Sequence, residues 1–166
     1  MTMPDESRFA ALRCSLPVAL EAMGERWSFL ILRGAFNGLC HFEEFQAALG
    51  IARNILSNRL AKLVESGILE RHGCIDRRKV EYRLTEKGKA LLPTLVALRQ
   101  WGERWGNCAP GNMVLVDSRD GLPVAEMAVL AADGRQLLPE ELLWVDRDRV
   151  LPCGQRALED VHAAVG

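Results

Sequence analysis

The sequence predicts a mainly α-helical domain that carries a two-stranded β-wing, followed by a small α+β C-terminal extension. Residues 42–65 hold two helical apolar patterns separated by a turn at Gly50. Residues 68–84 then read as a strand, a basic turn and a second strand. Residues 1–107 hold 16 Lys and Arg against 12 Asp and Glu, whereas residues 108–166 hold 5 against 10. We therefore expect a basic winged helix-turn-helix domain over residues 1–107 and an acidic extension over residues 108–166.

Length and composition exclude several classes of protein. A chain of 166 residues, 49% of them apolar, can bury a core. No apolar run reaches the roughly 18 residues that a membrane span needs, and the first residues are too charged to begin a signal peptide. The five cysteines are scattered without a CxxC pair, which argues against a disulfide framework and a zinc ribbon. We expect a cytoplasmic protein with no membrane partner, no metal and no cofactor.

Three helices are expected in the first part of the chain. The first spans residues 17–23, with a proline in its first turn and Gly24 at its end. The second spans residues 25–36 and is apolar almost all round, which is typical of a buried central helix. Gly34 weakens this helix unless another helix crosses it closely at that point. The third helix spans residues 42–49 and begins the helix-turn-helix.

The next helix, over residues 52–65, has an apolar face and a face of small polar side chains. The apolar face is formed by Leu56, Leu60, Leu63 and Val64. The other face holds Asn54, Ser57, Asn58 and Ala61. Asparagine can pair with adenine through two hydrogen bonds, so this face is suited to read base edges in the major groove. A solvated helix face would give the same pattern, although such faces usually carry Glu and Lys.

Cations near this helix and at the wing tip complete a predicted DNA-binding site. The wing tip, about residues 73–79, is expected to contact the DNA backbone or to enter the minor groove. The residues predicted to bind DNA are Arg53, Asn54, Ser57, Asn58, Arg59, Lys62, Arg77, Arg78 and Lys79. For Arg59 a structural ion pair is an equal alternative, because it lies at the edge of the apolar face.

A long helix is expected after the wing, over residues 86–105. Thr85 is suited to cap its N-terminus, and Pro93 should bend it. Its apolar residues recur at intervals of four and three, a spacing typical of helix-helix packing. The residues predicted to form a homodimer are Leu91, Leu95, Leu98, Trp101, Gly102 and Trp105. Packing of this seam against its own domain is the alternative.

The extension follows a linker over residues 106–112. Residues 113–117 and 123–130 flank an Asp-Gly turn and are expected to form a hairpin. A second Asp-Gly pair at 133 and 134 predicts another turn, residues 143–145 a strand, and residues 155–165 a final helix.

Several short motifs occur together in order, among them Gly24-Glu25-Arg26-Trp27, Leu56-Ser57-Asn58-Arg59-Leu60 and Val80-Glu81-Tyr82-Arg83-Leu84-Thr85. On these motifs the chain resembles the HxlR-type winged helix-turn-helix transcriptional regulators over about residues 14–106. The resemblance implies a bacterial homodimer that binds a palindromic operator in double-stranded DNA.

The chain departs from the family pattern in two places. Ala52 stands where the family usually has a serine that would cap the recognition helix, so the cap should be weak or come from elsewhere. Residues 129–134 lack the cysteine pairs that longer relatives carry, so the extension should be held by packing. Cys14 lies where redox-sensing members keep a reactive thiol, although cysteine is also an ordinary core residue. A metal site that joins Cys40-His41 to the pair at positions 72 and 74 is not expected, because the spacing fits no zinc pattern.

The predicted function is a dimeric, sequence-specific DNA-binding regulator that acts as a repressor, with activation as the open alternative. A winged-helix protein-interaction module without DNA binding is the alternative from another class. No nucleophile, acid-base pair or phosphate loop has supporting spacing, so we do not expect an enzyme. A redox signal, a small-molecule effector, or neither remains possible.

Overall fold

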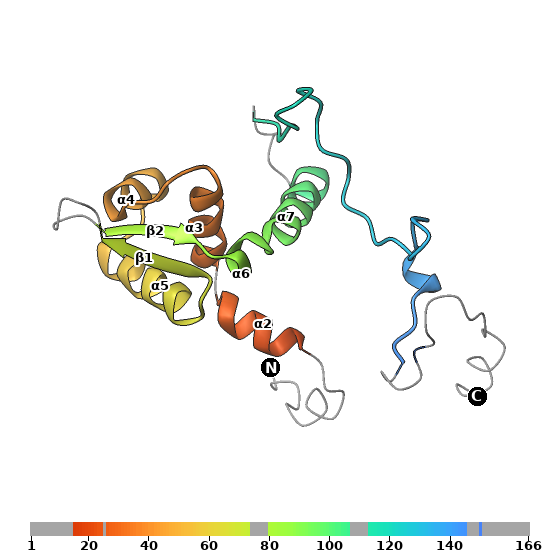
Figure 1. The fold of residues 1–166 in the computed structure, drawn as a ribbon, viewed down its shortest axis with the longest axis horizontal. Coiled ribbons are helices and arrows are strands. Elements are labelled where there is room, and N and C mark those ends of the chain that lie inside the picture. The colour runs from red at the N-terminus through yellow and green to blue at the C-terminus, as the bar shows by residue number, and fades with distance from the viewer. Residues whose placement is uncertain (1–14, 25, 74–79, 107–112, 146–149, 151–166) are drawn as a thin grey trace. The chain divides into compact units, whose positions relative to one another are not determined.

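A computed structural model describes residues 15–24, 26–73, 80–106, 113–145 and 150 of the chain. The elements are α2 (Leu16–Met23), α3 (Arg26–Phe36), α4 (Phe42–Leu49), α5 (Arg53–Glu65), β1 (Leu69–Gly73), β2 (Val80–Leu84), α6 (Glu86–Lys89), α7 (Leu92–Trp105) and η1 (Pro139–Glu141) (Figure 1). The chain divides into two compact units, residues 1–127 and 128–166. The composition-based division after residue 107 stays a prediction.

The expected helices of the first part are present, and glycines end two of them. Gly24 follows α2 with a φ of 68°, and Gly50 follows α4 with a φ of 59° in the left-handed region. Both values are accessible to glycine at little cost, which explains why the helices stop there. The helix-turn-helix therefore consists of α4, the turn at Gly50 and α5.

The core lies between α3, α4, α5 and the start of β1. Its fully buried large side chains are Phe45, Ile31, Leu32, Leu56, Leu60, Leu63, Ile68 and Leu69. The close crossing expected at Gly34 is confirmed, because a Cβ there would lie 3.0 Å from Leu39 Cδ1 and 3.1 Å from Phe45 Cε1. The missing side chain lets α4 approach α3.

The wing is a two-stranded antiparallel sheet in which Leu69 pairs with Leu84 and Gly73 with Val80. The segment before α4 joins its outer edge: His41 forms an isolated bridge with Glu81, and the Tyr82 amide donates to the Cys40 carbonyl at 2.7 Å. The wing strands are therefore tied directly to the start of the helix-turn-helix. The predicted tip contacts at 77–79 lie outside the described residues.

The prediction of a single bent helix over residues 86–105 is wrong, because the chain forms two helices, α6 and α7, with a break at residues 90–91. The Thr85 cap is confirmed: its hydroxyl accepts from the Gly88 amide at 3.1 Å. Pro93 is the second residue of α7. A proline lacks an amide donor and disrupts a helix interior but fits a first turn, so the chain ends one helix and begins another.

The extension contains both expected turns and less strand than predicted. Gly121 (φ 74°) and Gly134 (φ 84°) occupy the turns, which carry the single bridges Val116–Pro123 and Leu130–Gln136. The strand expected at 143–145 is wrong, since these residues are unpaired and the Trp144 side chain is fully exposed. A 3-10 turn, η1, precedes them. The helix predicted over residues 155–165 lies outside the described residues. Among the helices that the structure describes, none is long and apolar enough to cross a membrane.

Candidate nucleic-acid interface

Helix α5 presents its two faces as the sequence pattern indicates. Leu56, Leu60 and Leu63 are at most 1% exposed and anchor the helix in the core. The opposite face is open to solvent and holds Arg53, Asn54, Ser57, Asn58, Ala61 and Lys62. Short side chains in the middle of this face let another surface approach the helix backbone closely.

The first turn of α5 has no side-chain cap. Ala52 occupies the N-cap position in an extended conformation, and no side-chain hydrogen bond closes the turn. The amide groups at the start of a helix carry partial positive charge and can donate to an anion. The exposed N-terminus of α5 is therefore compatible with a phosphate group.

Arg53 is held in place by an aromatic ring of the preceding helix. Its guanidinium carbon lies 4.7 Å from the centre of the Phe42 ring. A cation–π contact of this kind limits the rotamers of a long side chain, so less entropy is lost when it binds. Sequence analysis missed this role of Phe42 because the two residues belong to different helices.

Arg59 is set apart from the rest of the predicted DNA-binding set. Its side chain is half-buried, and a Cβ added at Gly24 would lie 3.4 Å from Arg59 Nη1. The guanidinium therefore lies at the junction of α2 and α3. Both alternatives for Arg59, a DNA contact and a structural ion pair, stay predictions.

A cation on the wing strand was missed by the sequence analysis. Arg71 is exposed on β1, and its guanidinium carbon lies 6.0 Å from the centre of the Tyr82 ring. The Nε2 atom of its neighbour His72 lies 2.9 Å from Glu70 Oε1. The period-two alternation of a strand does not identify it, because Arg71 falls on the same face as buried Leu69, and β1 is exposed from Glu70 onward on both faces.

A polar cluster surrounds the start of α4. The Glu44 Oε2 atom accepts from the amides of Cys40 and His41, both at 2.9 Å. These two backbone bonds lower the pKa of the Glu44 carboxyl to about 2. Cys40 Sγ lies 3.2 Å from His41 Nδ1. The pKa of the Cys40 thiol is raised, mainly by its partial burial and to a lesser degree by the nearby carboxylates of Glu44 and Glu81.

The predicted dimer seam divides along α7. Leu91 and Leu95 pack against the core of their own chain. Leu98, Trp101 and Trp105 are exposed, the two tryptophans by 65% each. Helix α2 adds an exposed apolar set that sequence analysis did not single out, formed by Leu16, Val18 and Leu20.

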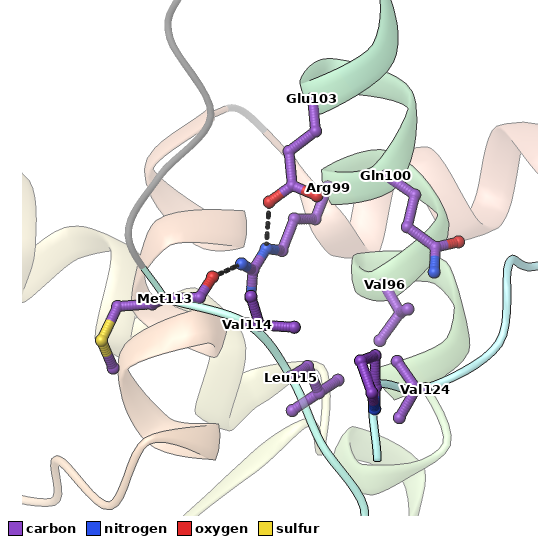
Figure 2. A pocket seen from close by; sticks show the side chains of 9 residues that line it. Val96, Arg99, Gln100, Glu103, Met113, Val114, Leu115 and Val124 are labelled. Atoms are coloured by element: carbon purple, nitrogen blue, oxygen red, sulfur yellow. Dashed lines mark hydrogen bonds and ion pairs between the residues drawn. The ribbon is translucent and has the colours of Figure 1, made fainter.

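The other side of α7 holds residues 113–127 of the extension. The Gln100 amide donates to the Ala125 carbonyl at 3.0 Å and accepts from the Met127 amide at 2.8 Å. Arg99 donates to the Met113 carbonyl, and Arg104 pairs with Glu126 at 2.9 Å. A shallow cavity of about 190 Å³ remains between this segment and α7 (Figure 2). It is lined by Val96, Arg99, Gln100, Glu103, Met113, Val114, Leu115, Pro123 and Val124.

Comparison with known proteins gives one family and several similar structures. The model of the HxlR-like helix-turn-helix family matches residues 22–109. The HTH-type transcriptional regulator Rv3095 of Mycobacterium tuberculosis is 48% identical over 88 residues, which are 52% of this chain and 56% of that protein. The chain thus spans about half the length of this curated relative.

Two solved structures extend the comparison. A crystal structure of PA1607, a candidate transcription factor, is 45% identical, with a TM-score of 0.75 over 81% of this chain and 95% of its own. The aligned share of this chain, 81%, is longer than the segment 22–109 that the family model matches, so the likeness includes part of the extension. The oxidized form of the redox regulator HypR is 29% identical, with a TM-score of 0.53 over 57% of this chain and 100% of its own.

Proposed function

Because the chain belongs to the HxlR-like helix-turn-helix family of transcriptional regulators, we propose that it is a homodimeric repressor that binds a palindromic operator. The observation that carries this proposal is the exposed face of α5, which is rich in small polar side chains and opposite a fully buried leucine face. A helix with this pattern fits the major groove of B-DNA, whose width admits one α-helix.

Within this proposal, the two ends of α5 have different tasks. Asn54, Ser57 and Asn58 read base edges, since they are short, exposed and able to donate and accept. Arg53, oriented by the Phe42 ring, contacts guanine or a phosphate near the uncapped helix start. Lys62 contacts the backbone. Arg59 takes the structural role that its burial favours.

The wing supplies contacts that do not depend on sequence. Arg77, Arg78 and Lys79 give it three adjacent cations, and exposed Arg71 adds a fourth on the strand. Each phosphate contact should steepen the salt dependence of binding by roughly 0.9 in the log–log slope. Loss of wing cations should therefore weaken binding to all DNA sequences alike.

The dimer interface is formed by the exposed apolar side chains of α7 and α2. Exposed tryptophans and leucines on a helix of a small protein are typical of an association surface. The α7 contribution is Leu98, Trp101 and Trp105 with Gly102, while Leu91 and Leu95 support the helix from within. A two-fold dimer places two α5 helices in successive major grooves, roughly 34 Å apart or a multiple of that distance.

Gel-shift and footprinting experiments on the DNA upstream of the chain's own gene test this proposal. Replacement of Asn58 by alanine should cost roughly 1–3 kcal/mol on the preferred site and relax the choice of base at one position. Replacement of Arg119, an exposed cation of the extension, removes one positive charge elsewhere and should leave base choice unchanged. Absence of salt-sensitive binding to every genomic fragment would overturn DNA binding. A reporter gene that rises when the regulator is deleted supports repression, and one that falls supports activation.

The alternative, a protein-interaction module without DNA binding, is separated by charge reversal at Arg77, Arg78 and Lys79. The module is favoured if a complex with a partner protein survives the reversal and if the reversal does not change the affinity for DNA.

For the signal, the redox regulator among the similar structures supports a thiol effector. The sequence candidate, Cys14, lies outside the described residues, and the cavity along α7 is the candidate place for a small molecule. Recovery of bound genomic DNA with and without a thiol oxidant distinguishes a thiol signal from a small-molecule signal.

A further inference from the structure

The start of α4 holds three side chains whose donor atoms converge. One ligand atom each of Cys40, His41 and Glu44 lies within 4.8 Å of the other two. Two of the separations are short: Cys40 Sγ to His41 Nδ1 is 3.2 Å, and His41 Nδ1 to Glu44 Oε1 is 3.3 Å. Around a tetrahedral zinc ion with ordinary bond lengths, ligand atoms lie about 3.4–3.6 Å apart.

From this convergence we propose that Cys40, His41 and Glu44 bind a divalent transition metal of the zinc type. The thiolate, imidazole and carboxylate together form a donor set that zinc accepts, with one coordination position left for water. Binding replaces the thiol proton of Cys40, which is released to solvent as the sulfur-metal bond forms.

The backbone around the site is already fixed. Glu44 uses Oε2 to accept the amides of Cys40 and His41, and this arrangement leaves Oε1 directed at the imidazole. The Cys40 carbonyl accepts from Tyr82 of β2. Two of the three ligands are thus held by bonds that do not involve the proposed metal, so little ordering is needed on binding.

The second nitrogen of the histidine also has a carboxylate partner. His41 Nε2 lies 3.9 Å from Glu81 Oε1 on β2. Histidines that bind a metal through one nitrogen commonly direct the other toward a carboxylate, which fixes the ring and raises its basicity. Glu81 in turn accepts from Arg83 Nε at 2.8 Å. Glu81 is therefore assigned as a positioning residue for the site.

The charge balance allows a cation at this helix start. The N-terminus of a helix carries partial positive charge, which disfavours a metal ion there. Two anionic ligands, the thiolate and the Glu44 carboxylate, neutralise the ion's double charge, and Glu81 lies beside the ring. The pair His72 and Cys74 is not needed, and His72 is engaged with Glu70.

The proposed site lies where the segment before α4 meets β2 (Figure 1). A bound metal would therefore join the helix-turn-helix more firmly to the wing, in addition to the bridge between His41 and Glu81. This consequence does not depend on the proposed DNA binding, because metal binding and thermal stability can be measured without DNA.

The test is a titration of the reduced full-length chain with Co²⁺, followed by displacement with Zn²⁺. We expect one equivalent of cobalt to give a thiolate-to-cobalt charge-transfer band. Replacement of Cys40 by serine removes the thiolate ligand, so it should abolish the band and weaken cobalt binding at least tenfold. Serine keeps the backbone bonds to Glu44, so the start of α4 should stay folded. The matched control, His72→Gln, removes an exposed histidine elsewhere and should leave the band unchanged.

A measurement on the unaltered chain avoids any folding defect of the variants. Zn²⁺ should protect Cys40 from alkylation, as read by mass spectrometry of its peptide. A band that persists in Cys40→Ser, or equal alkylation of Cys40 with and without Zn²⁺, would overturn the site. The cluster would then be only a hydrogen-bonded start of α4.

Discussion

Substitution of Gly88 by alanine is expected to destabilise the domain strongly, although alanine favours helices. Gly88 lies in α6 and is buried against the end of the turn that follows α5. A Cβ at this position would lie 2.2 Å from the Ile68 carbonyl oxygen and 3.0 Å from Leu84 Cδ2. The first distance is about 1 Å shorter than any ordinary contact, and its partner is backbone that cannot rotate away.

The size of the effect follows from the bonds that the shift would strain. The Ile68 carbonyl accepts from the Thr85 amide at 3.1 Å, whereas the single proton of the Thr85 hydroxyl is donated to the nearer Gly67 carbonyl at 2.7 Å. Loss of the amide bond costs about 1 kcal/mol, and overpacking adds roughly 1–3 kcal/mol. The gain in helix propensity returns only about 0.5–1 kcal/mol. We expect a net loss of about 1–3 kcal/mol.

Urea unfolding followed by circular dichroism measures this loss, with Gly102→Ala as the matched control. Gly102 also lies inside a helix, but a Cβ there meets nothing within 4 Å, so alanine should stabilise by about 0.5–1 kcal/mol. The reasoning fails if both variants stabilise the chain equally. A loss in Gly102→Ala that grows with protein concentration would instead support its place in the homodimer interface.

Three further predictions follow from single contacts. Glu44→Gln should reduce stability at neutral pH. The wild-type advantage should disappear as pH falls from 4.5 towards about 2, because the folded pKa of Glu44 lies below its ordinary value, and urea midpoints across that range check this. Thr85→Ala removes the cap of α6 and should cost about 1–2 kcal/mol in chemical denaturation, whereas Thr94→Ala, on the exposed side of α7, should cost little. Gln100→Ala should increase hydrogen exchange at the Met127 amide, and unchanged exchange there would contradict a stabilising role for the Gln100–Met127 hydrogen bond.

The sequence predicted much of this fold because the signals are local. The apolar spacing of residues 53–65, the glycine at 50 and the cap at Thr85 each act within a few residues of the chain, and each is present as expected. The exposed face of α5 follows from the same periodicity. A local pattern that is reinforced by a buried face leaves few alternatives to the chain.

Two omissions depend on contacts between residues that are distant in sequence, whereas the error at Pro93 is local. The polar cluster at the start of α4 depends on Glu81, forty residues from His41, and no spacing rule relates the two. The place of Arg53 depends on the Phe42 ring across a turn. Pro93 was expected to bend one long helix. It instead lies in the first turn of a separate helix, α7.

The two sides of α7 show why its periodicity alone could not define the dimer seam. Leu91 and Leu95 contact their own core, and Leu98, Trp101 and Trp105 continue the same stripe beyond it, where the side chains are exposed. The opposite side is occupied, because Gln100 and its neighbours hold residues 113–127 there. Only the distal part of the stripe is therefore available to a second chain. A tryptophan-to-alanine change at 101 or 105 should abolish association without loss of monomer stability, whereas Leu95→Ala should lower the stability of each monomer.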